Sequence, residues 1–167
     1  PLGIGIVATA MKKGLATKAD HTWGLQTMST LNAVGAKLPN GVHAMTDVTG
    51  FGLAGHLHEM LSASGTSAEL DYARIPTYDK VRLADLYAVG CMPQGTTKNY
   101  VTYYGDCGAV SGEQLFVLFD PQTSGGLLLA VAPEAQEAVE DLLRAEGVHA
   151  SPIGRVTSPQ EKKIVLA

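Results

Sequence analysis

The chain has 167 residues, 46% of them hydrophobic and 17% charged, with a formal net charge of −4. This length suits a single domain with a hydrophobic core, and an acidic chain without a basic stripe is poorly suited to bind nucleic acid or a membrane surface. No apolar run reaches the ~18 residues of a membrane span, and no signal-peptide pattern is visible. The 2 cysteines fit a reducing compartment. We therefore expect a cytoplasmic protein.

The first part of the chain is expected to be helical. Two lysines in the last turn and Gly14 at the end predict a short helix over 6–13. Asp20 is a favourable N-cap residue, so a longer helix is expected from there to Ala33, with Gly35 as its stop. The residues expected on its buried face share helical spacing: Leu25, Met28 and Leu31.

A strand and a glycine-rich turn follow, and they carry the most informative residues. The apolar run 42–48 predicts a strand with Asp47 near its end, then a Thr-Gly-Phe-Gly turn and a helix that ends at Gly65. Such a junction offers free backbone N–H groups and the positive end of a helix dipole, which suit phosphate, and a carboxylate beside phosphates suits Mg²⁺. Thr49 is the better-placed helix cap, which leaves Asp47 free. Alternatively, the glycines serve turn geometry alone and Asp47 is a solvated loop acid.

Strands and helices alternate along the rest of the chain. The ranges expected to be strands are 67–73, 127–131, 149–156 and 162–166, and the apolar run 127–131 is expected to be fully buried. The ranges expected to be helices are 79–89 and 133–146, and the apolar run 113–119 fits a helix or a strand, with a short helix favoured. The expected loops are 90–99 and 120–126. This order predicts an α+β fold, an α/β sandwich in which helices flank a mixed β-sheet, with antiparallel pairs near the end.

Several side chains have both a functional and an ordinary interpretation. His56 and Glu59 lie three apart on the expected helix and could share a ligand, with His58 turned elsewhere, but the spacing is not that of a zinc site and an ordinary helical role is favoured. Cys91 is a lone thiol in a Gly/Pro loop and is interpreted as a small hydrophobic residue rather than a nucleophile. The run 123–126 offers hydroxyls and flexible backbone, although its pattern alone favours a tight loop.

Two longer motifs point to a family. The stretch 46–56, Thr-Asp-Val-Thr-Gly-Phe-Gly-Leu-Ala-Gly-His, is followed about 70 residues later by 120–128, Asp-Pro-Gln-Thr-Ser-Gly-Gly-Leu-Leu. Together they closely resemble the C-terminal domain of selenophosphate synthetase (selenide, water dikinase), in the aminoimidazole ribonucleotide synthetase superfamily. The opening 1–5 and the closing 153–156 are similar to that family as well, so the resemblance spans nearly the whole chain.

The resemblance implies a fold, a reaction and partners. It implies a two-domain enzyme that converts selenide, ATP and water into selenophosphate, AMP and phosphate with Mg²⁺. In that family the N-terminal domain carries the reactive Cys or selenocysteine, a lysine and most metal-binding aspartates, and it forms a homodimer. Residues 1–167 would then be the single C-terminal domain of a longer enzyme, with no catalytic residue of their own and no activity in isolation.

The resemblance also implies site residues. Asp47 is the position expected to ligate Mg²⁺. The residues expected to line the nucleotide phosphates are Thr49, Gly50, Gly52, Thr123, Ser124, Gly125 and Gly126. A further family loop, Pro-Gly-Gly-Thr-x-x-Asn, matches 93–99 at Thr96 and Asn99, but Gln94 stands where the family has glycine, which puts close backbone approach there in doubt.

Two other functions stay open on the sequence. The chain could belong to another ATP-using member of the superfamily, which a substrate assay would separate. It could also be an interaction module that kept the fold without the chemistry. An upstream Gly-rich segment with Cys or selenocysteine and Lys would favour the enzyme.

Overall fold

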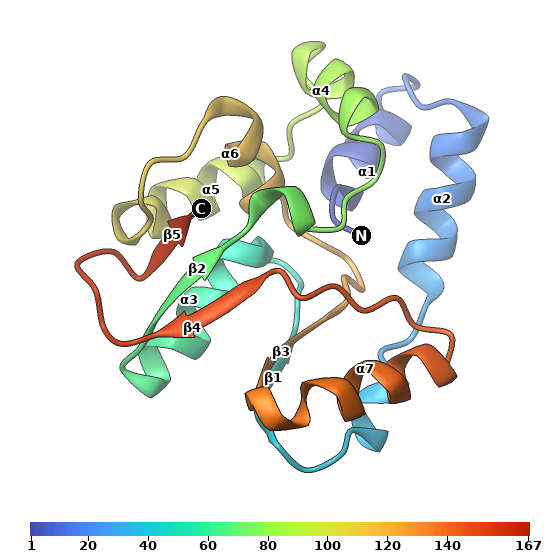
Figure 1. Ribbon diagram of the computed structural model, residues 1–167. Helices are drawn as coiled ribbons and strands as arrows, with labels where there is room; N and C mark the ends of the chain where they lie inside the picture. The colour runs from blue at the N-terminus through green and yellow to red at the C-terminus, as the bar shows by residue number, and fades with distance from the viewer.

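The structure is a computed structural model that describes all residues 1–167 (Figure 1). The helices are α1 (Ile4–Lys12), α2 (Lys18–Ser29), α3 (Gly52–Ser64), α4 (Lys80–Ala88), α5 (Gln94–Tyr103), α6 (Gly112–Leu118) and α7 (Gln136–Ala145). The strands are β1 (Val42–Asp47), β2 (Ser67–Leu70), β3 (Leu127–Val131), β4 (Gly154–Thr157) and β5 (Ile164–Leu166). The α+β class is confirmed. None of the helices is long and apolar enough to span a membrane.

The strands divide between two small sheets. β1 pairs with β3 in an antiparallel ladder, while β2 lies between an antiparallel β4 and a parallel β5. The expected mixed sheet is thus the β4-β2-β5 sheet, and β1–β3 forms a second one. The closing strands both pair with β2 and not with each other, since β4 takes one edge of it and β5 the other.

The core has a large and a small part. The large part is a cluster of 22 buried residues that includes Ile6, Leu53, Leu83 and Phe119. α1 lies between α2 and α4 and contacts both (Figure 1). The small part lies between α7 and the β1–β3 pair, which are side by side in Figure 1, and is built on Val34, Val139 and Leu143. The strand-to-helix junction at the end of β1 therefore lies where the two parts meet.

The second helix corrects the sequence interpretation. It begins at Lys18 because Thr17, not Asp20, is its N-cap: the Thr17 hydroxyl accepts from the Asp20 N–H, and the Asp20 carboxylate accepts from the Thr17 N–H. The expected inward residues Leu25 and Leu31 are 61% and 82% exposed. The helix instead packs through Gly24, where an added Cβ would lie 2.4 Å from the Met11 methyl group, so hydrophobic spacing misidentified its buried face.

Asp20 is buried, and its carboxylate accepts hydrogen bonds from Arg82 and Tyr78. Arg82 donates to its carboxylate from Nη2 at 2.6 Å and from Nε at 3.1 Å, and the Tyr78 hydroxyl donates at 2.9 Å. Burial alone would raise the pKa of Asp20, but the hydrogen bonds from Arg82 and Thr17 hold it well below its usual range. The helix also ends at Ser29 rather than Ala33, since 33–37 forms a 3-10 turn.

The expected loop 90–99 is wrong over its second half. α5 begins at Gln94, with Pro93 as an extended N-cap residue. Gly95 lets the helix approach the ring of Pro121, where an added Cβ would lie 2.9 Å from Cγ. Glycine and threonine favour loops in sequence, but here Thr96 and Asn99 are buried on the inner face of a helix. Tertiary packing thus overrides weak helix propensity.

Two strands differ in extent or burial from the expectation. β2 ends at Leu70 rather than 73, because the Asp71 side chain accepts from the Ala73 N–H and starts a 3-10 turn over Tyr72–Arg74. β3 is half-buried rather than fully buried, since it belongs to a sheet of only two strands and only Leu128 is enclosed.

Candidate functional site

The site is built around the junction between β1 and α3. The chain leaves β1 at Asp47 and enters α3 at Gly52. Gly52 has a φ of +69°, and a Cβ there would lie 2.9 Å from the Leu118 carbonyl oxygen and 3.0 Å from that of Asp120. Only glycine fits this close left-handed turn. Gly52 thus fixes the start of α3 against the segment that precedes the second motif.

The second motif lies directly against this junction. The Val48 N–H donates to the Gly126 carbonyl at 3.0 Å, and the Gln122 N–H donates to the Thr49 carbonyl at 2.9 Å. A Cβ on Gly125 would lie 2.3 Å from the Val48 carbonyl oxygen, so the two backbones touch. The structure therefore joins two motifs that are about 70 residues apart into one surface.

The N-terminus of α3 has unpaired donors. No side chain caps this helix of 13 residues. The backbone N–H groups of Thr49, Gly50 and Phe51 find no acceptor within the protein, and neither do those of Leu53 and Ala54 in the first helical turn. The expectation that Thr49 caps α3 is wrong, because its hydroxyl lies 3.2 Å from His56 Nε2 instead. The positive end of the helix dipole is thus left for a ligand or for water.

One exposed carboxylate precedes this open end in the chain, at the last residue of β1. Asp47 is exposed, and its carboxylate has no hydrogen bond or ion pair in the chain. No group of three or more His, Cys, Asp and Glu side chains in the chain could hold a metal ion. Nearby, the Asn99 amide donates to the carbonyls of Gly50 at 2.9 Å and Phe119 at 3.0 Å, so α5 braces the turn.

The four residues of 123–126 face in different directions. Thr123 and Gly126 are exposed. Ser124 has a positive φ of 54° and its hydroxyl donates to the Thr30 carbonyl at 2.7 Å, away from the junction. Gly125 is buried, and its carbonyl accepts from the Asn32 amide at 3.0 Å. Contact of these residues with a ligand stays a prediction.

Sequence reasoning missed the role of Asp120 and Gln122. Gln122 Oε1 accepts from the N–H groups of Gly3 at 3.2 Å and Ile4 at 3.3 Å, and Asp120 Oδ2 accepts from the Gly5 N–H at 2.9 Å. The Gln122 amide also donates to Asp120 Oδ2 at 2.9 Å, while Asp120 Oδ1 is buried without a partner. Burial raises the pKa of Asp120 to about 7, although hydrogen bonds from Gln122 and Gly5 oppose the rise. These two side chains cap α1, which no local pattern indicated.

The histidines and Cys91 lie largely as expected. His56 Nδ1 lies 3.1 Å from Glu59 Oε2, and the imidazole is buried. His58 faces away and pairs through Nε2 with Asp106 Oδ2 at 2.8 Å. Cys91 is fully buried in the main core, as an ordinary hydrophobic residue would be.

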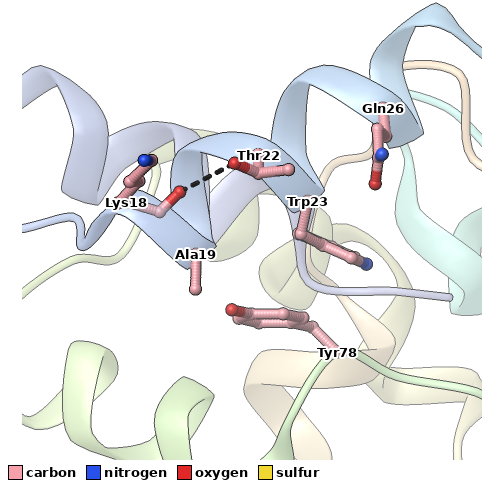
Figure 2. Close-up of a pocket in the computed structure, with 6 residues that line it drawn as sticks. All are labelled: Lys18, Ala19, Thr22, Trp23, Gln26 and Tyr78. Atoms are coloured by element: carbon pink, nitrogen blue, oxygen red, sulfur yellow. Dashed lines mark hydrogen bonds between the residues drawn. The ribbon is translucent and has the colours of Figure 1, made fainter.

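One surface hollow lies outside this site. It has a volume of about 530 Å³ and lies along α2, where Trp23 and Tyr78 stack at 4.2 Å between ring centroids (Figure 2). Its other lining residues are Lys18, Ala19, Thr22 and Gln26. None of the expected site residues lines it.

Comparison with known proteins gives a family for this arrangement. Residues 1–167 match the family described as AIR synthase related protein, C-terminal domain. The chain is 42% identical to a selenide, water dikinase of Photorhabdus laumondii over 99% of this chain and 48% of that protein, and 47% identical to one of Aeromonas hydrophila over 93% and 45%. The chain therefore spans about half the length of these relatives.

Two solved structures share the fold at low identity. Thiamine-monophosphate kinase from Stenotrophomonas maltophilia matches with a TM-score of 0.64 and 16% identity, over 99% of this chain and 47% of that one. E. coli HypE, a hydrogenase maturation protein, matches with a TM-score of 0.60 and 22% identity, over 99% and 44%. At this identity the likeness concerns the fold alone.

Proposed function

The chain belongs to the family of AIR synthase related proteins, as their C-terminal domain, and we propose that it is the half of a selenide, water dikinase that closes the Mg²⁺–ATP site. The observation that carries this proposal is the uncapped N-terminus of α3, preceded in the chain by the exposed carboxylate of Asp47 at the end of β1. The relatives that bear this activity in their names match the chain over nearly its whole length.

The open helix end suits the phosphates of a nucleotide. Backbone N–H groups that lack an internal acceptor can donate to phosphate oxygens, and the helix dipole adds favourable charge. Thr49, Gly50 and Phe51 supply such groups at the turn. Gly50 also has open space where a Cβ would stand, so a ligand can approach its backbone closely. Gly52, Ser124 and Gly125 support this surface through their packing, while the exposed Thr123 and Gly126 would border the ligand.

This chain offers part of a magnesium site, and the other ligands would come from phosphate, water and the rest of the full-length protein. Mg²⁺ is usually held by one or two protein carboxylates together with phosphate oxygens and water. Asp47 provides one carboxylate, free of any ion pair. When bound, Mg²⁺ would neutralise charge on the transferred phosphoryl group. The residues of this chain would hold and orient the phosphates, since phosphoryl transfer depends chiefly on positioning and electrostatics.

The remaining groups must come from elsewhere in the protein. The relatives are about twice as long as this chain. We infer that the N-terminal domain of the full-length protein completes the ATP site, binds selenide and forms a homodimer. The isolated chain is then inactive, and the location expected from the sequence is the cytoplasm.

Replacing Asp47 by Asn in the full-length protein tests this function. Asn keeps the size and one oxygen but removes the charge, so kcat for selenide-dependent AMP formation should fall by at least about 10²-fold, as for loss of one electrostatic stabiliser. Raising Mg²⁺ should restore part of the loss by mass action. Asp85→Asn is the matched control, because Asp85 is exposed on α4 and remote in sequence from both motifs. Near-normal turnover of Asp47→Asn at low Mg²⁺ would refute the assignment.

A further inference from the structure

One buried amide connects the turn before α3 to the residue that precedes the second motif. Asn99 lies on the inner face of α5 and is 5% exposed. Its side-chain nitrogen donates to the Gly50 carbonyl at 2.9 Å and to the Phe119 carbonyl at 3.0 Å. A backbone carbonyl can only accept, so the NH₂ end of the amide must face both partners. Both protons of this amide are thus used to hold backbone carbonyls.

The Gly50 carbonyl belongs to the central peptide unit of a β-turn. The Gly52 N–H donates to the Thr49 carbonyl at 3.0 Å, which closes a turn over 49–52. Phe51 has a φ of −87° and a ψ of −2°, as the third residue of a type I turn has. In a type II turn the central peptide unit is rotated by about 180°, and the third residue takes a positive φ that phenylalanine disfavours. The two turn types differ chiefly in where the Gly50 carbonyl and the Phe51 N–H point.

The observed turn directs the Phe51 N–H away from the protein interior. The carbonyl and the N–H of a trans peptide unit point in opposite directions, and the chain has no cis peptide bond. Because Asn99 holds the Gly50 carbonyl toward the buried Phe119, the Phe51 N–H faces outward. This N–H has no acceptor within the chain, and Gly50 beside it has open space where a Cβ would stand.

We propose that Asn99 is a positioning residue that holds the Gly50–Phe51 peptide unit in the orientation that presents the Phe51 N–H to a phosphate oxygen. This inference rests on the proposed function and gives a role in it to a residue outside both motifs. A donor that is already oriented needs no rearrangement when the phosphate arrives. The second bond of the amide, to Phe119, keeps the turn in a fixed place relative to the loop 120–126.

A purely structural role for Asn99 makes a different prediction. If the amide only stabilises α5, its loss lowers the free energy of unfolding and leaves the turn and the ligand affinity of the folded protein unchanged. Thr96 provides a matched control on the same helix. It is 1% exposed, and its hydroxyl has no hydrogen-bond partner, so Thr96→Val changes a buried polar residue without releasing a backbone carbonyl.

The orientation of the peptide unit can be measured without activity. Full-length protein labelled with carbonyl-¹³C glycine and ¹⁵N phenylalanine reports on this unit, because Gly-Phe occurs once in residues 1–167, and Gly50→Ala identifies the signal. In the wild type, the amide protons of Gly50 and Phe51 should give the strong NOE of a type I turn. Asn99→Leu should weaken this NOE and shift the Gly50 carbonyl carbon, whereas Thr96→Val should change neither. An unchanged NOE and carbonyl shift in Asn99→Leu would overturn the proposal.

Calorimetric titration of the full-length protein with Mg²⁺–ATP tests the consequence for binding. Asn99→Leu should weaken the affinity by about 10-fold, as for the loss of one hydrogen bond to a charged group. Asn99→Ser keeps one donor and should lose less than Asn99→Leu, and it also serves as the test variant if Asn99→Leu does not fold. Thr96→Val should bind within about 2-fold of the wild type. Unfolding in urea shows that each variant used is folded.

The outcomes distinguish this proposal from the proposed function. Normal formation of AMP by the wild type, together with wild-type affinity in Asn99→Leu and Asn99→Ser, would overturn the positioning role alone. A wild-type protein that forms no AMP from ATP and selenide would refute the proposed reaction. Weaker Mg²⁺–ATP binding by Asn99→Leu in that same protein would still support the role of Asn99 toward phosphate.

Discussion

The N-termini of α1 and α3 lie close to the same loop, yet one is closed and the other is open. At α1, the side chains of Asp120 and Gln122 accept from three successive N–H groups, those of Gly3, Ile4 and Gly5. At α3, no side chain caps the helix, and the turn before it keeps its donors free. The same backbone chemistry therefore serves the fold at one helix and is left for a ligand at the other.

The two halves of the loop 120–126 account for the difference between the capped α1 and the uncapped α3. Its first half turns polar side chains inward, where both Asp120 and Gln122 are buried. Its second half lies along the junction with backbone and glycine, so it brings no side chain that could cap α3. A motif associated with ligand binding can thus hold residues whose first role is to complete a helix.

The largest expected effect is the dependence of stability on pH that Asp120 causes at the closed end of α1. Asp120→Asn should remove this dependence. Burial raises the pKa of Asp120 from 3.8 to about 7, against the hydrogen bonds from Gln122 and Gly5. A carboxyl whose pKa is raised by folding favours the folded state below its unfolded pKa, and this contribution is lost as the pH rises through the folded pKa. The free energy of unfolding should therefore fall from about pH 4 to about pH 7, by up to about 4 kcal/mol.

Urea unfolding of the chain across this pH window measures the effect. Asp120→Asn cannot ionise, so its stability should change much less between about pH 4 and pH 7 than that of the wild type. The exposed Asp85→Asn should keep the wild-type slope. Equal slopes for Asp120→Asn and the wild type would show that the carboxyl ionises normally in the folded chain.

A smaller loss is expected when the closed end is opened, in Gln122→Ala. This change leaves the Gly3 and Ile4 N–H groups without their acceptor and should lower the free energy of unfolding by about 2–3 kcal/mol. Gln136→Ala is the matched control, because its exposed amide bonds only Glu140, and should cost less than about 0.5 kcal/mol. Urea midpoints at one pH compare the two. A loss for Gln122→Ala no larger than the control would mean that water replaces the amide at no cost.

The smallest effect on stability is expected when the open end is closed, in Gly50→Asp. The added carboxylate has open space and faces free N–H groups, so it should stabilise the chain by about 0.3–1 kcal/mol relative to Gly50→Ala. In the full-length protein the same carboxylate should weaken Mg²⁺–ATP binding, because it takes the place of phosphate. Thermal melting and calorimetric titration measure the two effects. Unchanged nucleotide affinity would argue that α3 does not receive phosphate.

The sequence predicted best those parts of the fold that depend on neighbouring residues. The β1 strand and the turn after it follow from an apolar run and from glycine, and Gly65 ends α3 with a φ of 64°, as expected for a C-terminal glycine. The helix expected over 133–146 is found as a 3-10 turn over Pro133–Ala135 followed by α7, with Val139 and Leu143 buried. The residues of the junction were likewise found from a local motif, although their contact with a ligand stays a prediction.

The errors arose where distant residues decide the structure. α2 buries Gly24 against α1 and Asp20 against Arg82, so its inner face carries no hydrophobic stripe. α5 forms from residues with weak helix propensity because it packs on Pro121. The role of Thr49 was also misassigned, because α3 begins at Gly52 with Phe51 as its N-cap residue, and the Thr49 hydroxyl bonds His56 across the first turns of the helix.

The closure of α1 has a consequence for the order of events during synthesis. The capping box of α2 joins residues three positions apart, but the bonds that Gln122 accepts from Gly3 and Ile4 join positions 119 and 118 apart in the chain. At about 5–20 residues per second, roughly 6–24 s pass between translation of the two partners. Throughout that interval the first helix keeps its polar end uncapped on the ribosome. The native α1 is therefore completed only after α2 to α6 have been made, and a stall before residue 122 would leave a nascent chain with both helix ends open.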